Sequence, residues 1–237
     1  MCTVSFFPQP NGGFVFTSNR DETPLRPAAA PTKHGQERKH WYGPYDRGTG
    51  GSWFGTNLHT TACLLNGAFV KHEHRPPYRR SRGVIVPELL QAASFAQFLA
   101  NSEFDGMEPF TLVVIEHPTN SVHLHELRWD GQQPHLKQID PQSPSWWQSA
   151  TLYNAEQSAL RSGWFHTWLD RVGHAPQQDE IFDFHATAGV GNPELDLCMD
   201  RGKVRTTSIT SLFWSPAEAR IRYLDLLAHE EHGLLLF

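Results

Sequence analysis

The first eighteen residues constrain the fold more than any other segment of the chain. Residues 2–7 and 14–18 are two apolar runs, separated by Pro8-Gln9-Pro10-Asn11-Gly12-Gly13. An Asn-Gly pair between two apolar runs is a strong signal for a β-hairpin, because both residues tolerate the backbone angles of a tight turn. The sequence therefore predicts that the chain begins with an antiparallel hairpin and that its first residues lie in a sheet.

The rest of the chain alternates between predicted strands and predicted helices. Residues 23–51 are rich in Pro, Gly and charge and are expected to form a loop. Strands are predicted at 52–56, 60–65, 111–116, 121–128, 204–214 and 219–224, with a turn at Pro118-Thr119-Asn120 between the third and fourth. Helices are predicted at 83–100, 155–172 and 179–187. This order favours an α+β fold with helices layered on largely antiparallel sheets, and a single domain over residues 1–237.

Composition narrows the class of protein and of partner. Hydrophobic residues make up 39% and charged residues 19% of 237 residues, which is typical of a globular chain. The net charge of −5 does not favour a nucleic-acid partner, and the one basic stretch, residues 71–82, is interpreted as an exposed loop. No apolar run reaches membrane-spanning length, and the N-terminus has no basic segment of a signal peptide. Three widely spaced cysteines fit a reducing, cytoplasmic setting. The oligomeric state is left open.

Cys2 is the first candidate for chemistry. Because Cys is small, removal of the initiator Met is expected, and the mature chain would begin with a thiol and a free α-amine on one residue. An α-amine titrates near neutral pH and can accept the thiol proton, so one residue supplies both nucleophile and base. The alternative is that Cys2 is simply a buried strand residue.

Asn19-Arg20-Asp21-Glu22 is the second candidate, because it lies where the predicted hairpin returns towards Cys2. Arg20 can favour a thiolate electrostatically, and Asp21 can hold an α-amine by a charge-assisted hydrogen bond. The alternative is a polar strand end that carries a surface ion pair.

Taken together, these motifs resemble the NRDE family, which is also called the transport and Golgi organisation family. Met-Cys and Asn-Arg-Asp-Glu form its signature, and further similar elements follow in the family's order. They are Gly50-Gly51-Ser52-Trp53-Phe54-Gly55, Leu65-Asn66, Arg82-Gly83, Asn154-Ala155 and Arg205-Thr206-Thr207-Ser208-Ile209. The resemblance extends from residue 2 to about residue 214. Tyr153, where the family usually has Ser, and Thr207-Ser208 depart from its pattern.

The NRDE family is in turn similar to N-terminal-nucleophile (Ntn) hydrolases of the penicillin V acylase and choloylglycine hydrolase type. This similarity implies a four-layer αββα sandwich and an amidohydrolase that cleaves a non-peptide C–N bond of a small amide or acylated substrate. Cys2 would be the nucleophile, with Arg20 and Asp21 as its electrostatic and amine-holding partners. Asn66 and Asn154 would stabilise the oxyanion or orient the amine, and Arg205 would lie near the thiol.

Other interpretations stay open beside this one. Studied relatives are associated with haem and lipid handling, which implies the alternative of a non-enzymatic carrier for haem or an acyl ligand. Trp164, Phe165 and Trp168 are expected in a core, or in the wall of an apolar pocket. No resident cofactor and no metal site are expected, since the His72/His74 and His123/His125 pairs lack further ligands. Cys63 and Cys198 are expected to be buried small residues.

Overall fold

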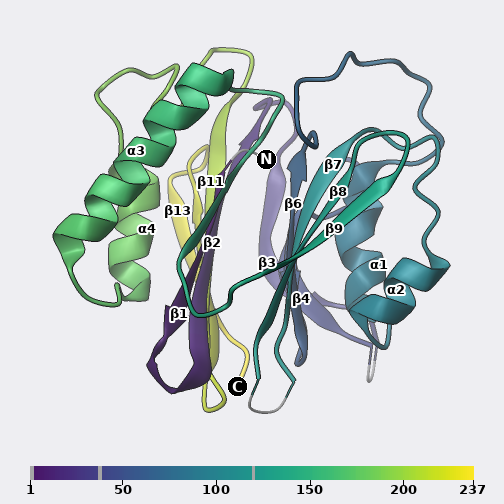
Figure 1. Cartoon of the computed structure of the whole chain (residues 1–237), viewed down its shortest axis with the longest axis horizontal. Helices are drawn as coiled ribbons and strands as arrows, with labels where there is room; N and C mark the ends of the chain where they lie inside the picture. The colour runs from purple at the N-terminus through teal and green to yellow at the C-terminus, as the bar shows by residue number, and fades with distance from the viewer. Residues whose placement is uncertain (1–2, 37–38, 119–120) are drawn as a thin grey trace. The chain divides into compact units, whose positions relative to one another are not determined.

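The computed structural model describes residues 3–36, 39–118 and 121–237 (Figure 1). The chain divides into two compact units, each built around its own sheet. The first unit comprises Met1–Pro27, Gln142–Gln148 and Leu152–Phe237, and the second comprises Ala28–Pro141 and Ser149–Thr151. None of the helices in the described part of the chain is long and apolar enough to cross a membrane. The single domain predicted from the sequence stays a prediction.

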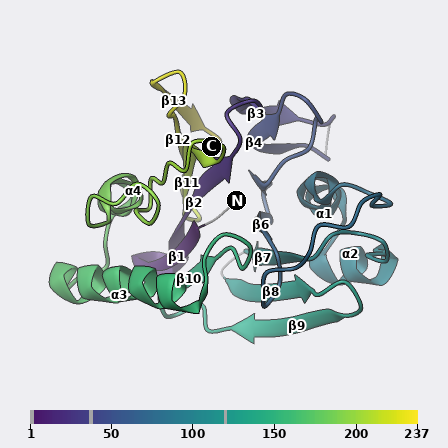
Figure 2. The same cartoon turned by 90° about the horizontal axis from the view of Figure 1, so that it is seen from above.

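The first unit has a six-stranded antiparallel sheet with two helices on one face (Figure 2). Its strands run in the order β10-β1-β2-β11-β12-β13. They are β1 (Thr3–Gln9), β2 (Gly13–Glu22), β10 (Ser145–Gln148), β11 (Arg205–Trp214), β12 (Ala219–Asp225) and β13 (Glu230–Leu235), and the helices are α3 (Ala155–Val172) and α4 (Gln178–Thr187). The predicted N-terminal hairpin is confirmed, with a 3-10 turn over Pro10–Gly12.

The core of this unit lies between the sheet and its helices. Strand side chains alternate between the two faces of a sheet, so every second residue of β1 and β2 points to α3 and α4. Phe7 of β1 meets Phe165 of α3, with ring centroids 5.6 Å apart, and Phe184 of α4 belongs to the same cluster. Phe165 is therefore a core residue, as one of the two interpretations predicted.

The second unit has a seven-stranded antiparallel sheet in the order β3-β4-β5-β6-β7-β8-β9. Its strands are β3 (Ala28–His34), β4 (Trp41–Asp46), β5 (Phe54–Thr56), β6 (Thr60–Asn66), β7 (Phe110–Glu116), β8 (His123–Trp129) and β9 (Pro134–Ile139). A 3-10 turn, Arg82–Val84, leads into α1 (Ile85–Gln91), and α2 (Phe95–Asn101) follows. Apolar residues of β6 and β7 pack against both helices in one cluster.

The α+β prediction is confirmed, since the described residues form two antiparallel sheets and four helices, a composition compatible with the predicted sandwich. The prediction of one helix over residues 83–100 is wrong. Ser94 ends the continuity, because its extended backbone and its hydroxyl cap a new helix, α2, by accepting from the backbone of Gln97. The loop predicted over residues 23–51 is also wrong, because it contains β3 and β4. Pro31 is tolerated there because β3 is an edge strand.

Candidate functional site

The Asn-Arg-Asp-Glu segment forms the end of β2, between β1 and β11. Asn19 lies opposite Thr3, the first described residue of β1. On the other side Asp21 lies opposite Thr206, and Arg205 lies opposite Glu22. The predicted return of the hairpin is confirmed as far as Thr3. Cys2 itself lies outside the residues that the structure describes.

Arg20 is buried, with only 3% of its surface exposed. Its Nη1 donates to the carbonyl of Arg26 (2.8 Å) and to the hydroxyl of Thr207 (3.1 Å). Thr207 is the extra residue of a β-bulge in β11, since the register shifts between Thr206 and Ser208. The bulge places Thr207, one of the residues that depart from the family pattern, within hydrogen-bond distance of Arg20.

Asp21 is also buried, and its Oδ1 accepts a hydrogen bond of 2.6 Å from the hydroxyl of Thr206. The Thr206 hydroxyl in turn accepts from the backbone N–H of Met199 (3.0 Å), which fixes its orientation. Asp21 is thus held in one position, as a carboxylate that binds an amine must be.

Asn19 joins β2 to α4 through a network that the sequence motifs did not reveal. Its Nδ2 donates to the carbonyls of His185 (3.1 Å) and Leu197 (2.9 Å). Its Oδ1 therefore faces Nδ1 of His185 at 2.6 Å, and Nδ1 must be the donor. Nε2 of His185 lies 2.7 Å from the hydroxyl of Ser5, which donates to it if the ring is neutral.

The ring of His185 is neutral over the physiological range. Burial, and to a smaller extent the positive charge of Arg161, lowers the pKa of His185 to about 3. Ser5, His185 and Asn19 have the donor–acceptor order of a catalytic triad, but all three side chains are fully buried. The network therefore holds the strand that carries the candidate residues. The sequence contains one signal for this network. His185 lies four residues after Ile181, so both side chains fall on the apolar side of α4.

The remaining candidates occupy three different settings. Arg205 is half-exposed at the start of β11, with Nη1 3.6 Å from a carboxylate oxygen of Asp200. Asn154 is an exposed N-cap of α3, and its Oδ1 accepts from the backbone of Gln157 in a capping box. Asn66 ends β6 in the second unit, where its carbonyl accepts from the hydroxyl of Ser149.

The two described cysteines are unsuited to nucleophilic chemistry. Cys63 is fully buried in β6. Burial, with a further contribution from the negative charge of Asp21, raises the pKa of Cys198 to about 12. The expected burial is confirmed for Cys63, whereas Cys198 is only partly buried. Cys2 remains the candidate thiol.

Two of the family-like elements have a structural explanation within the second unit. The backbone N–H of Ser52 donates to the carbonyl of Gly83 (2.9 Å). A side chain at Gly51 would place its Cβ only 2.7 Å from that carbonyl oxygen, so the two glycines allow the backbones to touch. The Gly-Gly and Arg-Gly elements thus form one packing contact at the start of the helical region.

Three of the four histidines in these pairs lie close to a carboxylate. His72 and His74 both contact Glu108, at 3.0 and 3.2 Å, and His125 lies 3.3 Å from Glu116. Among the described residues no three His, Cys, Asp or Glu side chains gather in a way that could hold a metal ion.

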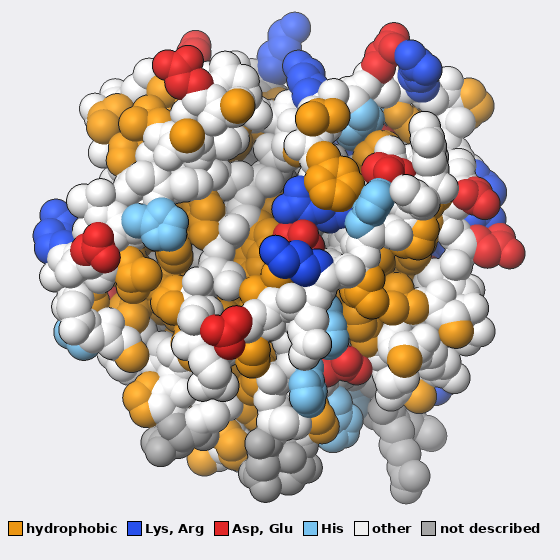
Figure 3. All heavy atoms as spheres, viewed as in Figure 1, with side chains coloured by type: hydrophobic (Ala, Val, Ile, Leu, Met, Phe, Trp, Pro, Cys, Tyr) orange, Lys and Arg blue, Asp and Glu red, His pale blue; other side chains and the backbone are white. Residues whose placement is uncertain are grey.

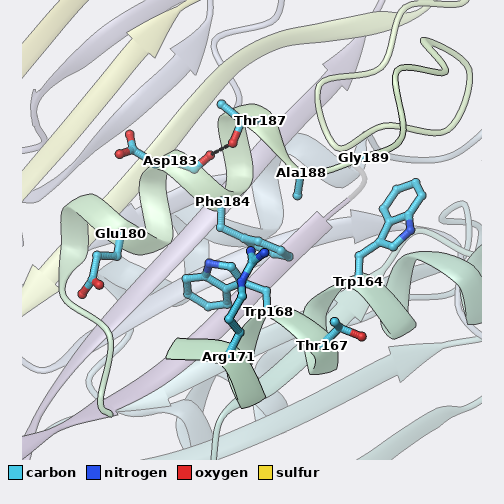
Figure 4. Close-up of a pocket in the computed structure, with 10 residues that line it drawn as sticks. All are labelled: Trp164, Thr167, Trp168, Arg171, Glu180, Asp183, Phe184, Thr187, Ala188 and Gly189. Atoms are coloured by element: carbon cyan, nitrogen blue, oxygen red, sulfur yellow. Dashed lines mark hydrogen bonds between the residues drawn. The ribbon is translucent and has the colours of Figure 1, made fainter. Parts of the chain in front are cut away.

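A groove of about 540 Å³ lies between α3 and α4 (Figure 4). Trp164, Trp168 and Phe184 form its apolar wall, and the rings of Trp168 and Phe184 stack with centroids 4.5 Å apart. Arg171 points across the rings in Figure 4, and the charged Glu180 and Asp183 complete the rim. Apolar side chains reach the surface at separate points around α3 (left in Figure 3). Trp164 and Trp168 therefore lie in the wall of a pocket, as the second of the two interpretations predicted.

These features define an α+β protein organised around an N-terminal hairpin that ends in a buried, hydrogen-bonded Asn-Arg-Asp segment. The family model described as Transport and Golgi organisation 2 (TANGO2) matches residues 1–167. The match covers more than half of the chain, which therefore belongs to the TANGO2 family. A comparison with curated proteins found no match.

Proposed function

We propose that the protein is an Ntn-type cysteine amidohydrolase that cleaves a small amide or acylated substrate through a thioester at Cys2. One observation carries the proposal: β1 and β2 pair so that Thr3, the residue after Cys2, lies opposite Asn19 of the Asn-Arg-Asp-Glu segment. A thiol nucleophile needs a nearby base and fixed charges, and this pairing brings a buried Arg20 and Asp21 to the start of β1.

In the proposed reaction the α-amine of Cys2 accepts the thiol proton. The thiolate attacks the carbonyl carbon of the substrate, and the C–N bond breaks as the amine leaves with that proton. Water then attacks the thioester, releases the acid and restores the thiol. Arg20 and Arg205 favour the thiolate, Asp21 holds the ammonium form, and the amide N–H groups of Asn154 stabilise the oxyanion.

The test is turnover of a panel of N-acyl amides by wild-type protein and by Cys2→Ala. The proposal expects activity that Cys2→Ala abolishes and that the control Cys198→Ala retains, with a Cys2-acyl adduct in the intact mass during turnover. If Cys2→Ala protein cleaves every wild-type substrate at the wild-type rate, the proposal is refuted.

A second candidate function is a carrier for an apolar ligand, and the groove between α3 and α4 supports it. Its volume lies within the usual range for small-molecule sites, and two indole rings offer a large apolar contact area. The ten residues that line it include no His, Cys, Met or Tyr. Haem in this groove would lack an axial ligand, so an acyl chain fits the lining better.

Titration of tryptophan fluorescence with a fatty acid and with haem tests the carrier function. Saturable quenching by the fatty acid that Trp168→Ala abolishes would favour a carrier. Leu160→Ala, on an exposed part of the same helix, is the control and should bind as the wild type does. Unchanged fluorescence with both ligands would contradict this function.

A further inference from the structure

A hollow of about 400 Å³ lies within the second unit, where two chain segments meet its two helices. Its walls come from the segment before β4 (Lys39, His40), the turn between β5 and β6 (Leu58, His59) and the region where α1 ends and α2 begins. The volume falls within the usual range for small-molecule sites. The hollow can therefore hold a small ligand.

The ionisable groups that line this hollow are all basic. They are Lys39, His40 and His59, and the ten described residues of the lining include no Asp or Glu. The groove between α3 and α4, by contrast, has Glu180 and Asp183 on its rim. A lysine ammonium and two imidazoles can all donate hydrogen bonds to an anion, and each protonated imidazole adds a positive charge. This basic hollow therefore favours an anionic ligand, although the chain as a whole carries a net charge of −5.

Asn57 fixes the turn that carries His59. Its Oδ1 accepts from the backbone N–H groups of His59 (2.8 Å) and Thr60 (2.7 Å), and its Nδ2 donates to the carbonyl of Leu90 in α1 (2.8 Å). Leu90 in turn packs closely on β5, since a Cβ at Gly55 would lie 2.6 Å from its Cδ1. Two walls of the basic hollow are thus held together, which lowers the entropy that a ligand must cost on binding.

The remaining lining atoms suit a phosphate group. Oε1 of Gln97 accepts from the backbone N–H of Ala93 (2.8 Å), so the Nε2 hydrogens of Gln97 remain for a ligand. A phosphate monoester carries about −1.5 to −2 charges near pH 7 and three acceptor oxygens, more than a carboxylate offers to donors from several chain segments. Leu58 is 51% exposed and adds an apolar surface beside the basic groups.

We propose that the basic hollow binds the phosphate group of a small phosphorylated molecule whose apolar part rests on Leu58. Lys39, His40 and His59 donate to the phosphate oxygens, and Gln97 adds a neutral donor. The site lies within the second unit, and the proposal does not rest on the chemistry of Cys2.

The test is isothermal titration calorimetry of the full chain near neutral pH in a phosphate-free buffer. Phenyl phosphate should bind saturably, and benzoate, which offers a ring with a single charge, should bind at least about fivefold more weakly. Lys39→Gln and His59→Gln should each weaken the binding of phenyl phosphate by about fivefold. Lys137→Gln and His123→Gln, the same changes at exposed positions of β9 and β8, are the matched controls and should bind as the wild type does.

Inorganic phosphate separates the two parts of the proposed ligand. It should bind more weakly than phenyl phosphate, because it has no apolar part to contact Leu58; equal affinity contradicts that contact. Phenyl phosphate affinity that Lys39→Gln and His59→Gln leave unchanged overturns the assigned site, as does the absence of saturable binding. Benzoate that binds as tightly as phenyl phosphate contradicts recognition of phosphate. Lys39 and His59 are exposed, so both variants should keep the wild-type circular dichroism spectrum.

Discussion

Acid should destabilise the first unit through His185, and His185→Gln should remove this part of the acid sensitivity. Burial lowers the pKa of His185 to about 3 from an ordinary value of 6.5. Between these values the unfolded chain binds a proton that the folded chain does not. The stability contributed by the neutral ring is therefore present above pH 6.5 and is lost as the pH falls towards 3.

The size of this loss depends mainly on the unfolded chain. Between about pH 7.5 and about pH 5, protonation of one histidine in the unfolded chain lowers the free energy of unfolding by about 2 kcal/mol. Burial also lowers the pKa of His117 to about 3. Its contribution to acid sensitivity cancels in the comparison, because the wild type and the variants all contain His117.

Urea unfolding at both pH values, followed by tryptophan fluorescence, measures the effect. His185→Gln should be less stable near neutral pH, by about 1–3 kcal/mol, because the bonds to Ser5 and Asn19 are altered. Its loss of stability on acidification should be smaller than the wild-type loss by about 2 kcal/mol. His166→Gln, on an exposed position of α3, is the control and should follow the wild type. Equal acid sensitivity of His185→Gln and wild type would refute the reasoning.

Two further substitutions test one packing contact in each unit. Thr206→Val removes the 2.6 Å hydrogen bond to buried Asp21 and should lower the free energy of unfolding by about 2 kcal/mol in urea; a change below about 0.5 kcal/mol would contradict the assigned contact. Gly51→Ala places a Cβ 2.7 Å from the carbonyl oxygen of Gly83 and should destabilise by about 1–3 kcal/mol. Gly163→Ala, where a Cβ meets nothing within 4 Å, is its control and should stabilise α3 by up to about 1 kcal/mol. Equal thermal midpoints for the two alanine variants would contradict the close glycine contact.

Local signals in the sequence predicted much of the fold. The Asn-Gly turn fixed the first hairpin, and apolar spacing located α3 and α4. The edge strands β9 and β13 were not predicted, because their residues are largely exposed and charged or polar residues interrupt the apolar ones. β3 and β4 were hidden by Pro31 and by Gly43-Pro44, which composition alone assigns to a loop.

The candidate site was predictable only where a motif marked it. Arg20 and Asp21 stand in a recognisable tetrapeptide, and Thr206 and Thr207 stand in a later family-like element, but their pairing across about 185 residues is set by the fold. The burial of Arg161 depends on tertiary packing, since an arginine in an amphipathic helix is normally expected on the solvent side.

The central claim is that Cys2 becomes a free, reactive N-terminal thiol. Intact mass of the purified protein, before and after a mild thiol-directed acylating probe near neutral pH, tests it most directly. The account predicts loss of Met1 and fast single labelling that Cys2→Ala abolishes, because Cys63 is buried and Cys198 has a pKa of about 12. Retained Met1, or labelling of Cys2 no faster than that of Cys63 or Cys198, would contradict it.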